Sequence, residues 1–165
     1  MRRAIPLLML LPPILSGCWY STTSRTAKGI KSISVPFFEN TTTEPSLEIS
    51  VTEKIIENLV DDNTLKVVDP DEADAILEGN IVEFRNVPFS FNMDLDAEEY
   101  HVELRVQVSL FSRRLNEPIW ENKTIKGDGS YFLEVSEAGL TYEDALAEAI
   151  EEITDQILNL TVQDW

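Results

Sequence analysis

The side chain with the most distinctive chemistry is Cys18, the single cysteine among the 165 residues. It directly follows Leu-Ser-Gly at positions 15–17, which close an apolar run over residues 5–15. Two arginines, at positions 2 and 3, precede that run. A basic start, an apolar core too short to span a bilayer stably and small residues at its end are typical of a secretory signal. One cysteine offers neither an internal disulfide nor a thiolate cluster for a metal, so we expect a different covalent use of this thiol.

The residues at positions 15–18 resemble the bacterial lipobox, in which Leu, a small residue, Gly or Ala and then Cys mark a cleavage site. The resemblance implies a thioether-linked diacylglycerol on Cys18, cleavage before it and an N-acyl chain on the new terminus. Stable anchoring needs more than one acyl chain, at about 0.8 kcal/mol per buried CH₂. We therefore expect residues 1–17 to be a lipoprotein signal peptide and the mature chain to be tethered to a membrane without spanning it. The alternative is an ordinary signal peptide, or a buried helix, with a chance cysteine.

The composition is strongly acidic, with 13 basic and 30 acidic side chains and a formal net charge of −17. Cleavage before Cys18 would remove two of the basic side chains and none of the acidic ones, which changes the net charge to −19. Nucleic acid is not an expected partner, because phosphate binding needs a positive surface. Adsorption to anionic lipid head groups by charge is disfavoured for the same reason.

A Ser- and Thr-rich segment over residues 18–29 shows no apolar period and is expected to be a flexible tether after the lipidated cysteine. Ten extended residues reach up to ~35 Å. Residues 30–165 then suit one domain.

Periodicity within that domain predicts its elements. Alternating apolar residues predict strands over residues 30–38, 65–68, 75–84, 99–111 and 119–126, with a bulge near 79–82 and an end at Gly127-Asp128-Gly129. Apolar residues at steps of three and four predict helices over residues 45–62 and 141–160, the second opened by a capping box at Thr141 and Asp144. We expect an α+β two-layer sandwich whose mostly antiparallel (mixed) sheet has four strands, one fewer than these five runs, with both helices on one face and the order β-α-β-β-β-α. The strand over 99–111 has the clearest alternation, and we expect Leu104 to face the helices and Arg105 to face solvent.

Blocks spread along the chain resemble one family. They are residues 30–41, 45–48, 65–79, 100–111, 118–121 and the C-terminal Thr-Val-Gln-Asp-Trp at 161–165. In this order, and with Cys18, they are similar to the LPS-assembly lipoproteins of the LptE family. The resemblance implies a non-enzymatic outer-membrane lipoprotein on the periplasmic side, a partner and plug of the β-barrel LptD in lipopolysaccharide transport, with no cofactor besides the acyl chains. Trp19, where Asp would favour inner-membrane retention, agrees with outer-membrane sorting.

Four basic residues form the only local concentration of positive charge, around the turn after residue 111 and the strand that follows. They are Arg113, Arg114, Lys123 and Lys126. If the turn brings them into one patch, they could bind the phosphates of lipopolysaccharide, because the arginine fork matches phosphate oxygens. The alternative is a solvated hairpin without ligand.

The connection over residues 87–95 carries apolar side chains at alternating positions, namely Phe89, Phe91, Met93 and Leu95. In a hairpin extension they would form an exposed apolar ridge, which usually marks a partner contact. The alternative is that they cover the end of the core.

Neither His101 nor the acidic residues near position 95 indicate a catalytic or metal site. His101 is the only histidine, and no nucleophile elbow, phosphate loop or His-carboxylate motif accompanies it in the sequence. The acidic residues at 94, 96 and 98 lack the glycine and the distant glutamate of a calcium loop. A second hypothesis for the function is a periplasm-facing lipoprotein that activates or scaffolds a cell-envelope synthase or a polymer-binding complex.

Overall fold

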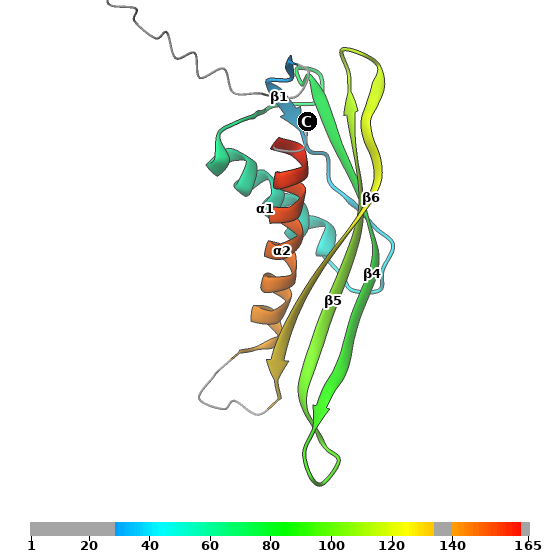
Figure 1. Cartoon of the computed structure of the whole chain (residues 1–165), viewed down its shortest axis with the longest axis vertical. Helices are drawn as coiled ribbons and strands as arrows, with labels where there is room; N and C mark the ends of the chain where they lie inside the picture. The colour runs from blue at the N-terminus through cyan, green and yellow to red at the C-terminus, as the bar shows by residue number, and fades with distance from the viewer. Residues whose placement is uncertain (1–28, 134–139, 163–165) are drawn as a thin grey trace, which may run out of the picture.

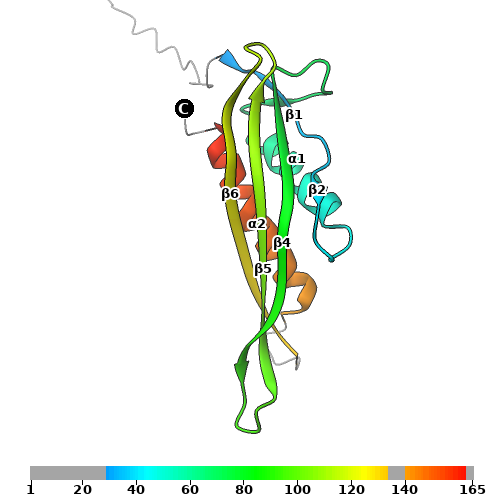
Figure 2. The same cartoon turned by 90° about the vertical axis from the view of Figure 1, so that its right-hand side faces the viewer.

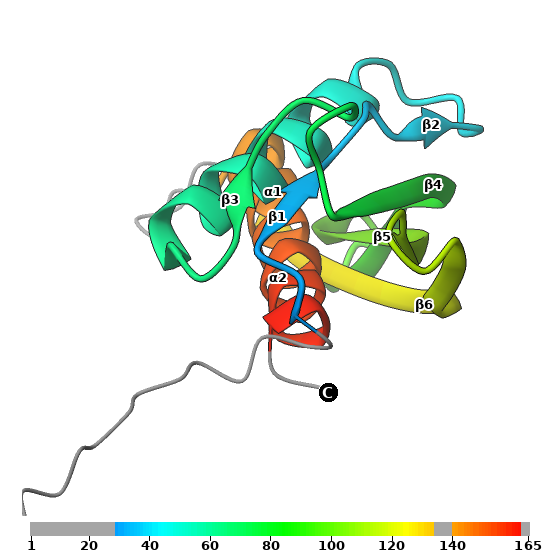
Figure 3. The same cartoon turned by 90° about the horizontal axis from the view of Figure 1, so that it is seen from above.

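The computed structural model describes residues 29–133 and 140–162. Its elements, in chain order, are β1 (Ser32–Ser34), β2 (Glu39–Asn40), α1 (Leu47–Asp62), β3 (Lys66–Val67), β4 (Ala75–Phe91), β5 (Ala97–Ser112), β6 (Glu117–Phe132) and α2 (Tyr142–Val162). One layer is the sheet and the other is formed by the two helices, which lie on the same side of it (Figures 1 and 3). The predicted α+β two-layer arrangement is therefore confirmed.

The sheet has six strands, in the order β3-β1-β4-β5-β6 with β2 paired to β4, so the predicted number of four is wrong. β1, β2 and β3 are only two or three residues long; β1 and β3 lie within predicted strands, whereas β2 lies outside every predicted one and is defined by its pairing with β4. The first predicted strand, over residues 30–38, is shortened to β1, which ends two residues before Pro36, a residue with no N–H for a ladder. The sheet is mixed: β1 runs parallel to β3 and β4, and β2 runs parallel to β4, whereas β4, β5 and β6 are antiparallel.

The predicted alternation along β5 is confirmed. Val102, Leu104, Val106, Val108 and Leu110 are at most 1% exposed and form the centre of the core. The side chains between them lie on the opposite face, which neither helix covers (Figure 2). The predicted bulge in β4 is also present, because the pairing with β5 shifts register between Ile81 and Glu83.

Both helices begin and end close to where the sequence predicts. α1 buries Leu47, Val51, Ile55 and Leu59 at four-residue spacing. The capping box of α2 is formed: Thr141 Oγ1 accepts from the Asp144 backbone N–H at 3.2 Å, and the Asp144 carboxylate accepts from the Thr141 backbone N–H at 2.9 Å. That hydrogen bond lowers the pKa of Asp144.

The prediction that Gly127-Asp128-Gly129 ends the last strand is wrong, because β6 continues to Phe132. A Cβ at Gly127 would lie 2.0 Å from the Ala149 carbonyl oxygen, and one at Gly129 would lie 2.2 Å from the Ala145 carbonyl oxygen. These glycines therefore permit the close approach of α2 to the sheet, and the facing positions on α2 are the fully buried Ala145 and Ala149.

The hairpin of β4 and β5 is longer than predicted and extends past the helical layer (Figures 1 and 2). Its tip lies at the opposite end of the molecule from β1, where the described chain begins (Figure 1). Neither of the two described helices is long and apolar enough to cross a membrane.

Candidate functional site: an apolar hairpin tip and an open polar sheet face

The hairpin tip carries the predicted apolar ridge. Its four large side chains, Phe89, Phe91, Met93 and Leu95, are between 57% and 102% exposed. The structure therefore contradicts the alternative in which they cover the end of the core. Exposed apolar side chains that gather at one place on a domain usually mark an interaction surface.

The tip has a defined backbone conformation. Asn92 Oδ1 accepts hydrogen bonds from the backbone N–H groups of Asp94 and Asp96, both at 2.9 Å, and Leu95 adopts a positive φ of 67°. These bonds close the loop without burying Met93 or Leu95. The turn thus presents apolar side chains in a fixed arrangement, which lowers the entropic cost of contact with a partner.

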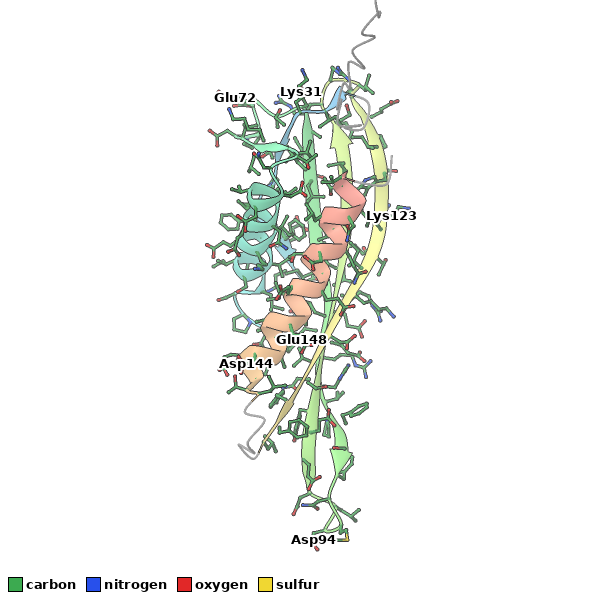
Figure 4. The ribbon with its side chains drawn as sticks, turned by 60° about the vertical axis from the view of Figure 1, so that its left-hand side comes forward. Lys31, Glu72, Asp94, Lys123, Asp144 and Glu148 are labelled. Atoms are coloured by element: carbon green, nitrogen blue, oxygen red, sulfur yellow. The ribbon has the colours of Figure 1, made fainter. Side chains whose placement is uncertain are left out.

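Acidic side chains alternate with the apolar ones at the tip. Asp94, Asp96 and Glu98 are all exposed (Figure 4 labels Asp94). No group of three or more His, Cys, Asp or Glu side chains within the described residues could hold a metal ion. The tip is therefore best described as an apolar ridge with an acidic border.

The uncovered face of the sheet carries cross-strand ion pairs. Arg105 Nη1 lies 2.6 Å from Glu83 Oε2, and Arg85 Nη1 lies 2.9 Å from Glu103 Oε2. These rungs neutralise one another locally, although the chain as a whole is strongly acidic. Partly exposed pairs of this kind contribute little to stability, so their main effect is to keep this face polar and hydrated.

His101 has neighbours that the sequence did not reveal. Pairing of β5 with β6 places Ser130 Oγ 3.1 Å from His101 Nδ1 and Asp128 Oδ2 3.6 Å from His101 Nε2. The Phe89 ring lies 5.5 Å from the imidazole, centroid to centroid. The sequence shows no His-carboxylate motif around this histidine, and the structure brings Asp128 near it only through the pairing of β5 with β6.

This group does not amount to an acyl-transfer site. A nucleophilic serine needs backbone or side-chain donors directed at a developing oxyanion. Here the three side chains stand on neighbouring rungs of β5 and β6, whose backbone groups are engaged in the ladder. The arrangement supports a polar contact surface rather than catalysis.

The arginines predicted to bind phosphate have structural contacts. Arg113 donates from its side chain to the Pro70 carbonyl and from its backbone N–H to the Asp74 carbonyl at 2.9 Å. Arg114 lies against Gly29, where its guanidinium leaves limited room for a Cβ. These two residues help to hold together the end of the domain at which β1 begins.

Asp74 is the centre of that end. Its carboxylate accepts from the backbone N–H groups of Lys31 at 2.9 Å and Ser32 at 3.2 Å. These hydrogen bonds, with a smaller contribution from the charge of Arg114, hold the pKa of Asp74 below its usual value. The acidic turn before β4 therefore fixes the start of β1.

The remaining two predicted basic residues lie elsewhere. Lys123 pairs with the buried Val108, which places it on the face that carries the helices, whereas Lys126 pairs with Arg105 on the open face. Lys126 is about 26 Å along the strand direction from Arg113, from the usual rise per residue. The four residues do not form the single compact patch that the sequence suggested. Cys18 lies outside the described residues.

Fold and site together define a two-layer α+β domain with one uncovered polar sheet face and a protruding apolar hairpin. Solved structures share this fold at low sequence identity. The hypothetical protein CT253 from Chlamydia trachomatis is 12% identical, with a TM-score of 0.58 over 79% of this chain and 94% of that one. The uncharacterized lipoprotein B from Nitrosomonas europaea is 17% identical, with a TM-score of 0.51 over 81% and 86%. A minor lipoprotein from Acinetobacter baumannii is 16% identical, with a TM-score of 0.52 over 81% and 92%.

The family is established by sequence. The LptE family, described as lipopolysaccharide-assembly, matches residues 30–161. The chain therefore belongs to the LptE family. The comparison with curated proteins found no match.

Proposed function

We propose that this protein is an outer-membrane lipoprotein that occupies an LptD-like β-barrel and supports its assembly and its delivery of lipopolysaccharide. The observation that carries the proposal is the family match over residues 30–161. The protein contributes binding surfaces rather than catalytic groups, as expected for a family whose role is assembly.

The open sheet face supports this role physically. The lumen of an outer-membrane barrel is polar and hydrated, so a plug needs a polar outer surface. The ion pairs of β4 with β5 provide such a surface over a rigid antiparallel sheet. The buried side of the sheet is covered by α1 and α2, so the core does not need the partner to close it.

The hairpin tip supplies the second contact. Phe91, Met93 and Leu95 extend beyond the helical layer, and we propose that they pack against the partner barrel. Cys18 would carry the acyl chains that hold the other end of the protein at the periplasmic surface of the outer membrane. The tether and the hairpin would then fix the orientation of the domain from opposite ends.

Co-purification tests this proposal. The tagged mature protein, extracted from outer membranes in mild detergent, should carry a large heat-modifiable barrel in equimolar amount. Replacing Phe91, Met93 and Leu95 with Ser should reduce the recovered barrel several-fold. The matched control replaces Ile49 and Val60, exposed apolar residues on α1, with Ser and should leave recovery unchanged. Recovery of an envelope synthase and no barrel would refute the proposal and favour the second hypothesis.

A further inference from the structure

A shallow hollow on the open sheet face differs from the ion-paired region beside it. It lies over β2, β4, β5 and the neighbouring part of β6 and has a volume of about 480 Å³, within the usual range for ligand pockets. Phe37 forms one wall and is 69% exposed. Asn80, Gln107 and Asn122 line it together with the carboxylates of Glu39 and Glu78.

The strand register explains how these groups come together. Glu39 pairs with Asn80, and Asn80 pairs with Gln107 on the next strand. Residues in such a row stand on the same face, about 4.8 Å apart from strand to strand. The row therefore presents one carboxylate and two amides in a line, at a spacing similar to the size of one sugar ring.

The amides are free to bind. Within the described residues, the side-chain amides of Gln107 and Asn122 have no hydrogen-bond partner, and that of Asn80 is engaged only through its oxygen, by Thr41 Oγ1 at 3.5 Å. Each amide both donates and accepts, which matches the dual character of a hydroxyl group. The neighbouring charged side chains, in contrast, are already engaged in ion pairs, Arg105 with Glu83 and Arg85 with Glu103.

The charge of the hollow selects the ligand. Within the described part of the chain no lysine or arginine lines it, whereas two carboxylates do, so phosphate groups and other anions are disfavoured. Hydroxyl groups can donate to those carboxylates and bond to the amides. The exposed face of the Phe37 ring carries negative potential and attracts the polarised C–H groups on the apolar side of a sugar ring.

We propose that this hollow binds an uncharged stretch of saccharide, with Phe37 as the stacking wall and Asn80, Gln107 and Asn122 as the hydrogen-bonding floor. Two sources in the cell envelope share this chemistry, the sugars of lipopolysaccharide and the glycan strands of peptidoglycan. The first source would deepen the proposed function and rests on it. Binding of peptidoglycan glycan would not depend on the proposed function.

The test is a titration of the mature, acylated, ¹⁵N-labelled chain in detergent micelles. The two probes are neutral: the uncharged hexose segment of deacylated, dephosphorylated lipopolysaccharide core, and short peptidoglycan glycan fragments whose lactyl carboxylates are amidated. We expect one of them to shift the side-chain NH₂ signals of Asn80, Gln107 and Asn122 while leaving that of Asn58, hydrogen-bonded between the helices, in place. A shift with the core oligosaccharide identifies the first source, and a shift with glycan fragments identifies the second.

Two variants test the assignment. Phe37→Ala and Gln107→Leu should each weaken binding about fivefold, from a lost stacking or hydrogen-bonding contact, without lowering thermal stability. Phe91→Ala, which removes another exposed phenylalanine outside the hollow, should bind as the wild type does. Absence of shifts with both probes at about 10 mM, which excludes even weak binding, would overturn the inference. So would shifts that do not involve the hollow. The barrel partnership would survive either result, because co-purification tests it separately.

Discussion

Gly127→Ala offers the sharpest test of how the two layers meet. The new Cβ would lie 2.0 Å from the Ala149 carbonyl oxygen and its neighbourhood includes Ile153 Cγ1 at 2.9 Å. Ordinary carbon contacts lie near 3.5 Å, so α2 must move outward by about 1.5 Å or β6 must bend. The obstacle is the helix backbone, which cannot rotate away as a flexible side chain would.

The cost follows from overpacking. Inserting a methyl group into a packed contact costs about 1–3 kcal/mol, and the smaller entropy of alanine in the unfolded chain returns about 0.5 kcal/mol. We expect a net loss of about 2 kcal/mol, or a melting temperature about 6 °C lower. Urea unfolding followed by far-UV circular dichroism measures it.

The control is Thr124→Ala, on the same strand but exposed on the open face, which should change the free energy of unfolding by less than about 0.5 kcal/mol. If Gly127→Ala unfolds at the wild-type urea concentration, the close approach of α2 to β6 is wrong. The explanation given for the glycines in this strand would then fail with it.

Two further predictions concern the sheet and its anchored end. Leu104→Asp should unfold the domain, because it places an unpaired charge at a position that is 1% exposed, whereas Gln107→Asp on the opposite face should be tolerated; equal melting temperatures would refute the strand phase. Asp74→Asn should lower stability at pH 7, since the folded-state pKa of Asp74 is depressed and its contribution is complete above the unfolded value. That contribution is lost as the pH falls through the folded pKa, so the gap between wild type and variant should close below about pH 4, and a gap independent of pH would contradict the assigned hydrogen bonds.

Local periodicity was sufficient to predict the helices and the central strand. The four-residue spacing in α1 and the strict alternation in β5 both arise from one buried face, and each appears directly in the sequence. The capping residues of α2 were recognisable for the same reason, because the two hydrogen bonds of a capping box link residues three positions apart.

Features that depend on the register between strands were not predictable. Gly127 resembles a turn residue until the position of α2 is known. Ser130 and Asp128 lie more than 25 positions from His101 and meet it only through the pairing of β5 with β6. The supposed basic patch failed likewise, because strand alternation separates Lys123 from Lys126 onto opposite faces.

The same distinction separates the two candidate surfaces: one follows from a local sequence pattern and the other does not. The apolar ridge of residues 89–95 was visible as an alternation in the sequence, and the structure supplied only its exposure and its place at the end of the molecule. The polar hollow, in contrast, draws on four strands, β2, β4, β5 and β6, and on the loop between β1 and β2. No local pattern joins Phe37 to Gln107 or Asn122.

Site-specific photocrosslinking tests the central claim most directly. A photoreactive amino acid at Met93, on the hairpin tip, should form a covalent adduct with an LptD-like barrel when intact cells are irradiated. The same amino acid at Glu53, on the solvent side of α1, is the control and should give at most a weak adduct with the barrel. No barrel adduct from Met93, or an adduct with an envelope synthase in its place, would contradict the account.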